Sequence, residues 1–453
     1  MKNKKLSSYL TYLISFVVFT VSTFFFLNYY ISWFNIPAMV IPCIILSLAS
    51  AVIFRCAAKN KKNVIKILSA FIGFLFPNAF VWGLNRLSGD LLDDGFKGIS
   101  LSFVLLFAVY CIIGVILLLK QSENAGKTLC RITAVLLAVS MISSAVYCTR
   151  FFGVSKNDTV ENYDKKVAAV TIFENKFEDA VPQTELYNII KNHFESELPD
   201  GKTEKKCIVI GYDGCRDDVF TYLNTHKTSG VNDILDMNGH AYISYCGGVN
   251  YPEENTQDTS TAPGWCSILT GVWADVHGIT GNDINKSNDY LTLLTTLVES
   301  KTIDSSKFCV SWKGHFSNDN STYILEKDYI EKNSINSEFL CASGDNGTYK
   351  NVMSDISADS CSDFMFCIFE HNDHTGHSTG FASDSVGYQK AFAQNDKFAD
   401  DIISAIKSRV TYETEDWLFI ITSDHGGIKT SHGGPSKQER YTFIITNKSL
   451  SAD

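Results

Sequence analysis

The chain has 453 residues, of which 45% are hydrophobic and 19% are charged, and its formal net charge is −10. This composition excludes a disordered chain, and the length predicts two or three domains. The charge is split, because residues 1–150 carry 14 Lys and Arg against 4 Asp and Glu, which leaves 25 against 45 for the remaining residues. The pattern predicts a membrane domain followed by an acidic globular domain, and the absence of a basic stripe argues against nucleic-acid binding.

The first 150 residues contain five apolar segments, and a bilayer span needs roughly 20 such residues. The segments are Tyr9–Ile31, Ile36–Phe54, Val64–Leu84, Ile99–Leu119 and Ile132–Cys148. Basic residues gather before the first segment and in the loops after the second and the fourth, which places these parts in the cytoplasm. We therefore expect a multi-pass plasma-membrane protein with a cytoplasmic N-terminus and everything after Cys148 outside. Because Lys66 is the one charged residue found within a span, we expect an anchor and not a transporter.

Residues 151–205 are expected to form a stalk that contains one amphipathic helix, Thr184–Glu195. From residue 206 onwards, short apolar runs alternate with helical patterns, of which Ser385–Arg409 is the clearest. The runs predicted to be buried strands are Lys206–Tyr212, Phe308–Trp312, Phe364–Phe369, Trp417–Thr422 and Tyr441–Ile445. This alternation predicts that residues 206–453 form an α/β domain with a mostly parallel sheet flanked by helices.

Acidic residues and histidines directly follow three of these predicted strands. They are Asp213 after the first, Asp373 and His377 after the third, and Asp424, His425 and His432 after the fourth. Since ligands bind at the carboxyl ends of parallel strands, we expect these side chains to meet at one edge of the sheet. Carboxylates and imidazoles gathered in this way predict a site for Zn²⁺ or a similar divalent ion.

A further segment offers a group on which such a site could act. Residues 259–271 begin polar and become helical, and Pro263 suits the first turn of a helix. Thr261 then lies near the helix N-terminus, where backbone N–H groups and the helix dipole favour an anion such as phosphate. A cation would activate its hydroxyl as a nucleophile. Thr261 could equally be the N-cap of the helix, and the two roles are compatible.

The order of these motifs resembles that of the alkaline phosphatase superfamily, and most closely its type I phosphodiesterase/nucleotide pyrophosphatase branch. The resemblance covers residues 205–447 and rests on four motifs. These are Asp213-Gly214, the segment from Thr261 through Thr270-Gly271 to His277-Gly278, Asp373 with Gly376-His377, and Ser423-Asp424-His425-Gly426 with His432-Gly433. It implies an alkaline-phosphatase-like fold and two divalent metal ions, Zn²⁺ before Mn²⁺. It also implies in-line attack on phosphorus by a threonine.

The resemblance also implies a role for each matched residue. One ion would be held by Asp373, His377 and His432. The other would be held by Asp213, Asp424 and His425, with Thr261 as its fourth ligand and as the catalytic nucleophile. The remaining candidates are contacts to the substrate: Gly264, Trp265, Lys313, His315 and Asn282. Trp265 could instead belong to the core, and Lys313 and His315 could instead lie on the surface.

The chain departs from the family patterns at three places. Gly264 stands where the phosphodiesterase branch has an asparagine that contacts phosphate, which puts a nucleotide substrate in question. Thr261 and Trp265 stand where sulfatases have a Cys or Ser and an Arg, and a threonine cannot become formylglycine, so sulfatase activity is not expected. The chain stops at Asp453, soon after the last predicted strand, and could be shortened at this end.

The predicted architecture has a second resemblance. Five spans followed by an external domain of this superfamily resemble lipoteichoic acid synthases and phosphoethanolamine transferases. The main hypothesis is a membrane-anchored, two-metal phosphohydrolase that cleaves a phosphodiester or phosphomonoester. A lipid or a glycan could carry this phosphate ester. The alternatives are a transferase that moves a lipid-derived phospho-group to a glycan or glycolipid, and an inactive binding module. The cysteines show no metal-binding spacing, and few disulfides are expected.

Overall fold

The computed structural model describes residues 158–225, 229–250, 254–283, 287–288, 290–358 and 360–450. These residues belong to one compact unit, Val154–Asp453. The five predicted spans, which all precede residue 149, lie outside the described residues. Within the described part, no helix has the length and the apolar composition that crossing a membrane requires.

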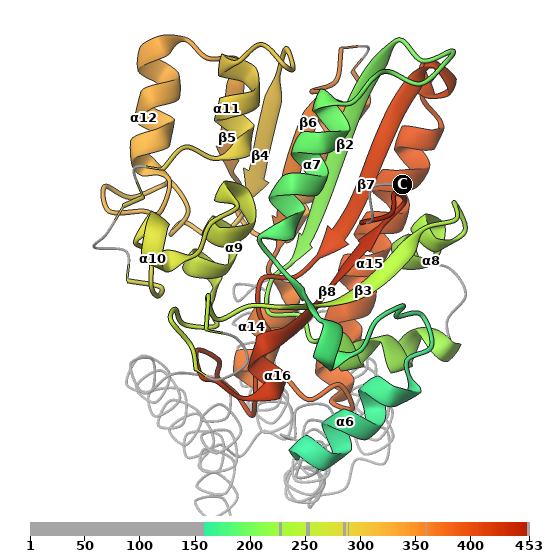
Figure 1. The fold of residues 1–453 in the computed structure, drawn as a ribbon, viewed down its shortest axis with the longest axis vertical. Coiled ribbons are helices and arrows are strands. Elements are labelled where there is room, and N and C mark those ends of the chain that lie inside the picture. The colour runs from blue at the N-terminus through green and yellow to red at the C-terminus, as the bar shows by residue number, and fades with distance from the viewer. Residues whose placement is uncertain are drawn as a thin grey trace, which may run out of the picture. The chain divides into compact units, whose positions relative to one another are not determined.

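The unit is built around one eight-stranded sheet with the strand order β1-β3-β8-β7-β2-β6-β4-β5 (Figure 1). The strands are β1 (Val181–Pro182), β2 (Glu204–Tyr212), β3 (His240–Tyr245), β4 (Ser306–Val310), β5 (Ser337–Cys341), β6 (Phe364–Phe369), β7 (Glu415–Thr422) and β8 (Tyr441–Thr446). All pairings are parallel except those of β8, which runs antiparallel to β3 and β7. The predicted α/β class and mostly parallel sheet are therefore confirmed.

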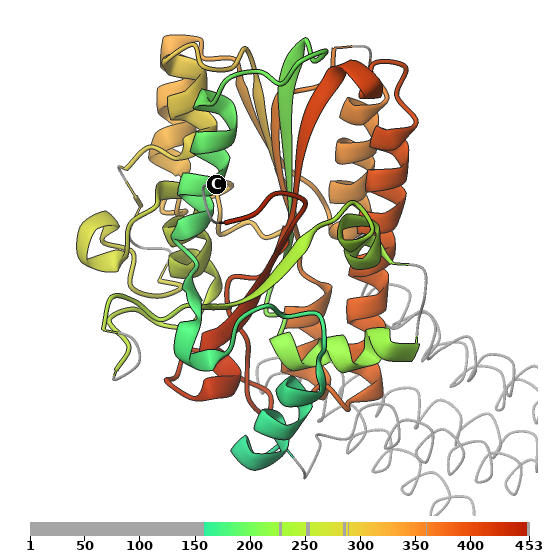
Figure 2. The ribbon, with the colours of Figure 1, turned by 45° about the vertical axis from the view of Figure 1, so that its right-hand side comes forward.

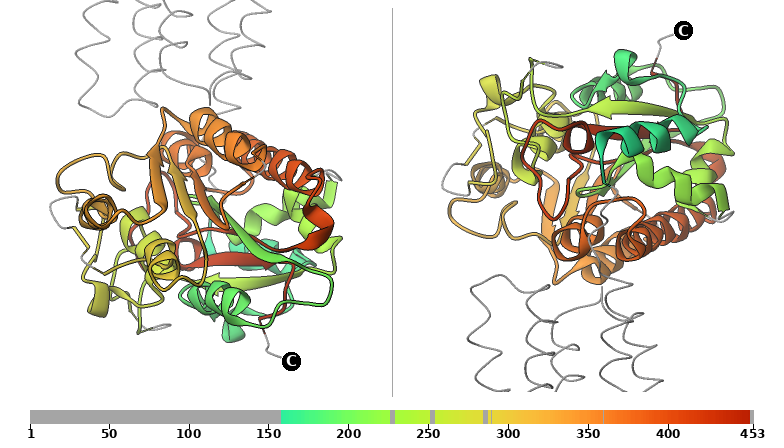
Figure 3. Two further views of the ribbon diagram at one scale, coloured as in Figure 1. Left: turned by 90° about the horizontal axis from the view of Figure 1, so that it is seen from above. Right: turned by 90° about the horizontal axis from the view of Figure 1, so that it is seen from below.

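Helices cover both faces of this sheet (Figures 2 and 3). They are α6 (Val160–Ala169), α7 (Glu185–Glu195), α8 (Gly230–Leu235), α9 (Thr261–Thr270), α10 (Ala274–His277), α11 (Leu293–Glu299), α12 (Ile324–Asn333), α13 (Asp345–Ile356), α14 (His371–Thr379), α15 (Val386–Lys407) and α16 (Lys437–Arg440). Three short 3₁₀ helices complete the unit: η2 (Phe177–Asp179), η3 (Asp217–Thr225) and η4 (Tyr412–Thr414).

The central strand β2 shows why two helical layers are needed. Cys207 and Val209 point to one face and pack with apolar side chains of α7, α9, α11 and α12. Ile208 and Ile210 point to the other face and pack with α8, α13 and α15. Successive side chains of a strand alternate between its faces, so a strand that is apolar at every position must be covered on both sides.

The segment before β2 differs from the predicted stalk. The predicted helix Thr184–Glu195 is present as α7, but its apolar face packs into the core through Leu186, Ile189 and Ile190. The short strand β1 joins the sheet beside β3, and Tyr163 of α6 is buried. Residues 158–205 are therefore part of the globular unit and do not form a spacer.

Candidate metal and phosphate site

The proposed metal ligands converge because their strands are neighbours in the sheet. β2 lies between β7 and β6, and all three run in the same direction. Asp213 follows β2, Asp424 and His425 follow β7, and Asp373 lies in the first turn of α14, just beyond β6. The arrows of these strands in Figure 1 point down towards α14 and α16, so the carboxyl ends meet at this edge. The structure thus brings the three predicted motifs together.

Two groups of side chains at this edge have metal-ligating atoms within 4.8 Å of one another. The first consists of Asp213, Asp424 and His425, all fully buried. The Nε2 atom of His425 lies 3.6 Å from Oδ1 of Asp213 and 3.4 Å from Oδ2 of Asp424. This is the set that the resemblance assigns to one ion.

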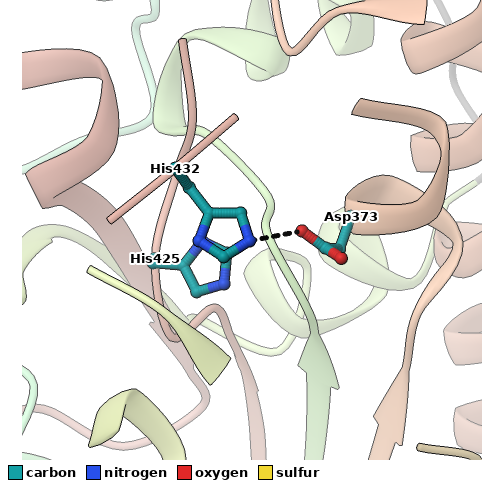
Figure 4. Close-up of side chains that lie close together, drawn as sticks. All are labelled: Asp373, His425 and His432. Atoms are coloured by element: carbon teal, nitrogen blue, oxygen red, sulfur yellow. Dashed lines mark ion pairs between the residues drawn. The ribbon is translucent and has the colours of Figure 1, made fainter. Parts of the chain in front are cut away.

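The second group consists of Asp373, His425 and His432 (Figure 4). The rings of His425 and His432 lie with their centroids 4.1 Å apart, and Nε2 of His432 is 3.4 Å from Oδ1 of Asp373. His377 reaches the same place, with its Nε2 atom 3.4 Å from Oδ2 of Asp373 and 3.1 Å from Nε2 of His432. His425 therefore lies between the two groups, whereas the resemblance places it in the first alone.

The three imidazoles are held in the same way. Nδ1 of His425 lies 2.7 Å from the carbonyl oxygen of Gly426. Nδ1 of His432 lies 3.0 Å from the carbonyl oxygen of Thr259, and Nδ1 of His377 lies 3.0 Å from that of Thr430. A carbonyl oxygen only accepts, so each Nδ1 donates its proton and the Nε2 atom of each ring is the one that faces the cluster. Carbonyl partners of this kind fix the tautomer of metal-binding histidines.

Several of the atoms that face the centre have no hydrogen-bond partner. They are Nε2 of His425, Oδ2 of Asp424 and Oδ1 of Asp373, all buried. Buried acceptors are nearly always satisfied in folded proteins. Nε2 of His377 and Nε2 of His432 lie 3.1 Å apart, a contact that requires a proton or a cation close to both nitrogens. The donor set of carboxylate oxygens and imidazole nitrogens therefore fits divalent cations.

The pKa shifts of the cluster also favour a bound cation. Burial, followed by the charge of Asp373, raises the pKa of Asp213 well above its usual value, and burial with the charge of Asp213 does the same for Asp424. Burial lowers the pKa of His425 to about 3, so this ring is a neutral ligand. For His377, burial opposes protonation, but the hydrogen bond with Asp373 raises its pKa to about 9. A bound cation would remove the repulsion between the carboxylates and would displace the proton from His377.

Thr261 is the first residue of α9, and its side chain faces the first group. Its hydroxyl lies 3.4 Å from Oδ1 of Asp213, to which it donates, and the residue is 5% exposed. The N-cap is Ser260, whose side chain makes no capping bond, so the alternative role of Thr261 as the N-cap is wrong. Few N–H groups remain for an anion there, because Pro263 has none, and those of Ala262 and Gly264 are donated to Asn282 and to the carbonyl of Ser260.

Two predicted substrate contacts prove to be packing positions. A Cβ atom at Gly264 would lie 2.9 Å from both Cβ and the carbonyl oxygen of Asp424, so this position has no room for a side chain that reaches the substrate. Trp265 is fully buried in the core, where it cannot stack on a base or sugar. Its indole Nε1–H instead donates to Oδ2 of Asp213 at 2.8 Å and so orients that carboxylate.

The other three predicted substrate contacts differ in placement. Asn282 is exposed next to Thr261, and its Oδ1 accepts the N–H of Ala262 at 2.8 Å. Lys313 is exposed on the loop after β4. His315 is fully buried among aromatic rings, including those of Phe308 and Tyr323, so the predicted contact with substrate is wrong for this residue.

The described cysteines are free thiols, and all but Cys341 are buried.

Two charged residues that were not among the predicted site residues lie close to the cluster. Glu370, at the end of β6, is 2% exposed, and burial followed by the charge of Asp213 raises its pKa well above the usual value. Arg216 is fully buried three residues after Asp213. Both residues could have been predicted from their position, because each is a charged residue shortly after an apolar strand. A charge that is buried there usually needs a partner.

With the geometry in view, comparison with known proteins identifies the family. Residues 207–448, just over half of the chain, match the model of the type I phosphodiesterase / nucleotide pyrophosphatase family. The chain belongs to this family. The match begins inside β2 and ends after β8, so it contains every residue of the two metal-ligating groups. The predicted membership of the alkaline phosphatase superfamily is thereby confirmed.

Several solved structures are also similar to the chain, all at low identity. Murine ectonucleotide pyrophosphatase / phosphodiesterase 5 is 20% identical with a TM-score of 0.35, and the match covers 49% of this chain and 57% of that one. The phosphonate monoester hydrolase of Agrobacterium radiobacter is 12% identical with a TM-score of 0.35, covering 53% and 68%. The alkaline phosphatase of the Antarctic bacterium TAB5 is 13% identical with a TM-score of 0.32, covering 54% and 91%. No curated protein sequence matches the chain.

Proposed function

We propose that the chain is a membrane-anchored, metal-dependent phosphoester hydrolase that cleaves a phosphodiester through Thr261. One observation carries the proposal. Three histidines and three carboxylates, several of them with unpartnered buried atoms, form two adjoining groups, and Asp213 of the first accepts from the Thr261 hydroxyl. Family membership supports the reaction class, and the cluster supports the dependence on metal.

The cluster is large enough to hold two divalent ions. Asp213, Asp424 and His425 would hold one near Thr261, and Asp373, His377 and His432 would hold the other, with His425 within reach of both. Zn²⁺ suits the mixture of nitrogen and oxygen ligands best, and Mn²⁺ is the second candidate. When bound, such ions supply Lewis-acid stabilisation of the attacking and leaving oxygens.

The chain itself supplies the nucleophile and its orientation. Thr261 Oγ1 is aligned by Asp213, which the indole of Trp265 holds from the other side. Attack by Oγ1 on phosphorus forms a P–O bond to Thr261 and breaks the P–O bond to the leaving alcohol, which departs with the proton that Thr261 loses. Attack by water then breaks the bond between Thr261 and phosphorus, which releases the phosphomonoester and restores the hydroxyl. A residue that becomes covalently attached in this way splits one difficult step into two easier ones.

The side chain of Asn282 is the best-placed contact for the phosphate. Its Oδ1 is fixed by the N–H of Ala262, and this leaves the Nδ2 amide of an exposed side chain beside Thr261. An amide donor here compensates for the small number of free N–H groups at the start of α9. Asn282 would thus replace Gly264 and Trp265 as the residue that orients the substrate.

The test compares Thr261→Ala with Thr270→Ala in the full-length protein. Both threonines lie in α9 and are 5% exposed, but the Thr270 hydroxyl donates to the carbonyl of Cys266 and not to Asp213. Turnover of bis(4-nitrophenyl) phosphate should fall about 10³-fold or more in Thr261→Ala, with the metal content unchanged, and stay near wild type in Thr270→Ala. Equal turnover in Thr261→Ala and wild type would rule out the proposed nucleophile.

The membrane anchor and the external location of the domain are part of the proposal. They rest on the five apolar segments and on the basic residues of their loops. A phosphate ester linked to a lipid or a glycan at the outer membrane surface would suit such an enzyme. Protease treatment of intact cells should cut the domain, and protection of the domain until the cells are lysed would contradict this orientation.

A further inference from the structure

The fully buried side chain of Arg216 lies against the loop that carries His425 and His432. Its Nη1 donates to the carbonyl oxygen of Gly427 at 3.3 Å. A Cβ atom at Gly426 would lie 3.0 Å from Cγ of Arg216, so the loop rests directly on the aliphatic part of the side chain. The carbonyl of Gly426 is the one that fixes the tautomer of His425.

Two acidic residues hold Arg216 in this position. Asp218 binds it with both oxygens, accepting from Nε at 2.9 Å and from Nη2 at 2.9 Å. Asp158 accepts from Nη1 through Oδ1 at 2.9 Å, and its side chain is 4% exposed. The second oxygen of Asp158 accepts the backbone N–H of Lys429 at 3.4 Å. Asp158 therefore contacts both Arg216 and the loop.

The helix that follows Asp158 is packed over the same cluster. Tyr163 of α6 is 1% exposed, its hydroxyl donates to Oδ1 of Asp217 at 2.7 Å, and its ring lies 5.2 Å from the guanidinium of Arg216. Lys437, in the chain segment after His432, pairs with Asp164 of α6 at 3.0 Å. α6 thus contacts both Arg216 and the chain that follows the segment with His425 and His432.

We propose that Arg216 is a positioning residue for residues 424–432 and that Asp158 makes the segment 158–170 part of the support of the metal site. This segment precedes the residues that match the family model, 207–448. The same loop supplies the Thr430 carbonyl that holds His377, so a displaced loop would disturb all three histidines. Loss of residues that orient metal ligands typically weakens metal binding 10–100-fold. The proposal rests on the proposed function only where metal binding is measured.

The test compares Asp158→Asn with Glu161→Gln in the full-length protein. Both substitutions remove one carboxylate from the start of the same segment, but Glu161 is exposed and pairs only with Lys165. In metal-free protein, Asp158→Asn should speed amide hydrogen exchange in peptides covering 424–432 several-fold, while Glu161→Gln should not. The Kd for Co²⁺ should rise about 10-fold in Asp158→Asn, with a changed visible absorption spectrum.

Arg216→Lys keeps the positive charge but loses the paired contacts with Asp218, and it should change exchange and the Kd for Co²⁺ in the same direction. Unchanged exchange and unchanged Co²⁺ binding in Asp158→Asn would overturn the positioning role, even if the protein hydrolyses phosphodiesters. Faster exchange in a protein that binds no metal would instead support the positioning role and contradict the proposed function.

Discussion

The hydrogen bond from Trp265 to Asp213 offers a direct measure of how the site is supported. Both residues are fully buried, and Nε1 and Oδ2 are 2.8 Å apart. A hydrogen bond to a charged group contributes about 1.5–3 kcal/mol, which corresponds to roughly a 10–100-fold change in an equilibrium constant. Trp265→Phe removes this donor and keeps an aromatic ring. We expect the Kd for Zn²⁺, measured by competition with a chromogenic chelator, to rise by this factor.

A control is needed because the smaller ring also leaves a cavity. Phe366→Leu makes a cavity in the same cluster, since the Phe366 ring packs edge-on against Trp265 with centroids 5.7 Å apart. It leaves the hydrogen bond to Asp213 intact. Each variant should lower the free energy of unfolding of the metal-free protein by about 1–3 kcal/mol, but Trp265→Phe alone should weaken Zn²⁺ binding. Equal Zn²⁺ affinity in the two variants would refute the role given to Trp265.

Two further predictions concern packing and pH. Gly264→Ala should lower the free energy of unfolding by about 1–3 kcal/mol in thermal or denaturant melts, and it should weaken Zn²⁺ binding. Alanine normally stabilises a helix, but here the added Cβ would press on Asp424. Burial raises the pKa of Glu326 to about 7, although the hydrogen bonds from Thr295 and Thr292 act to lower it. The folded state therefore holds a proton on this residue more tightly than the unfolded state does between pH 4.5 and 7. The free energy of unfolding should therefore fall as the pH rises through this window, and Glu326→Gln should reduce the fall by as much as about 3 kcal/mol in denaturant titrations at pH 5 and pH 8.

The sequence predicted the strands that are apolar on both faces. Phe364–Phe369 has the bounds of β6, and the predicted Trp417–Thr422 and Tyr441–Ile445 lie within β7 and β8. It missed β5, Ser337–Cys341, a five-residue strand with mixed apolar and polar residues at one edge of the sheet. It also missed β3, His240–Tyr245, whose apolar and polar residues are mixed, and β1, which has only two residues. Both strands lie on the side of the sheet where β8 runs antiparallel, and their pairing depends on contacts distant in sequence.

The convergence of the proposed metal ligands was predictable because a polar residue directly after a buried strand must lie at the edge of the sheet. Asp213 and Asp424 illustrate this rule, and the sheet order then brings them together. The substrate contacts were harder to predict, because spacing does not reveal which way a side chain points. Trp265 and His315 are two examples. Both were predicted to contact the substrate, yet both side chains are fully buried.

The stalk was mispredicted for a related reason. Charged residues such as Asp158 and Lys166 suggest an exposed spacer when only composition is considered. In the structure, Asp158 and Asp217 are partners of Arg216 and Tyr163, and Lys166 donates to Ser383. The charges at the start of the domain thus stabilise the packing of α6 and do not keep the segment in solvent.

The measurement that tests the central claim most directly is the stoichiometry of Zn²⁺ bound to the full-length protein, determined by calorimetric titration and elemental analysis. The proposed site predicts two ions per chain in the wild type. Asp373→Asn should leave one tightly bound ion, because the group of Asp213, Asp424 and His425 remains. Absence of specific Zn²⁺ and Mn²⁺ binding in the correctly folded wild-type protein would contradict it.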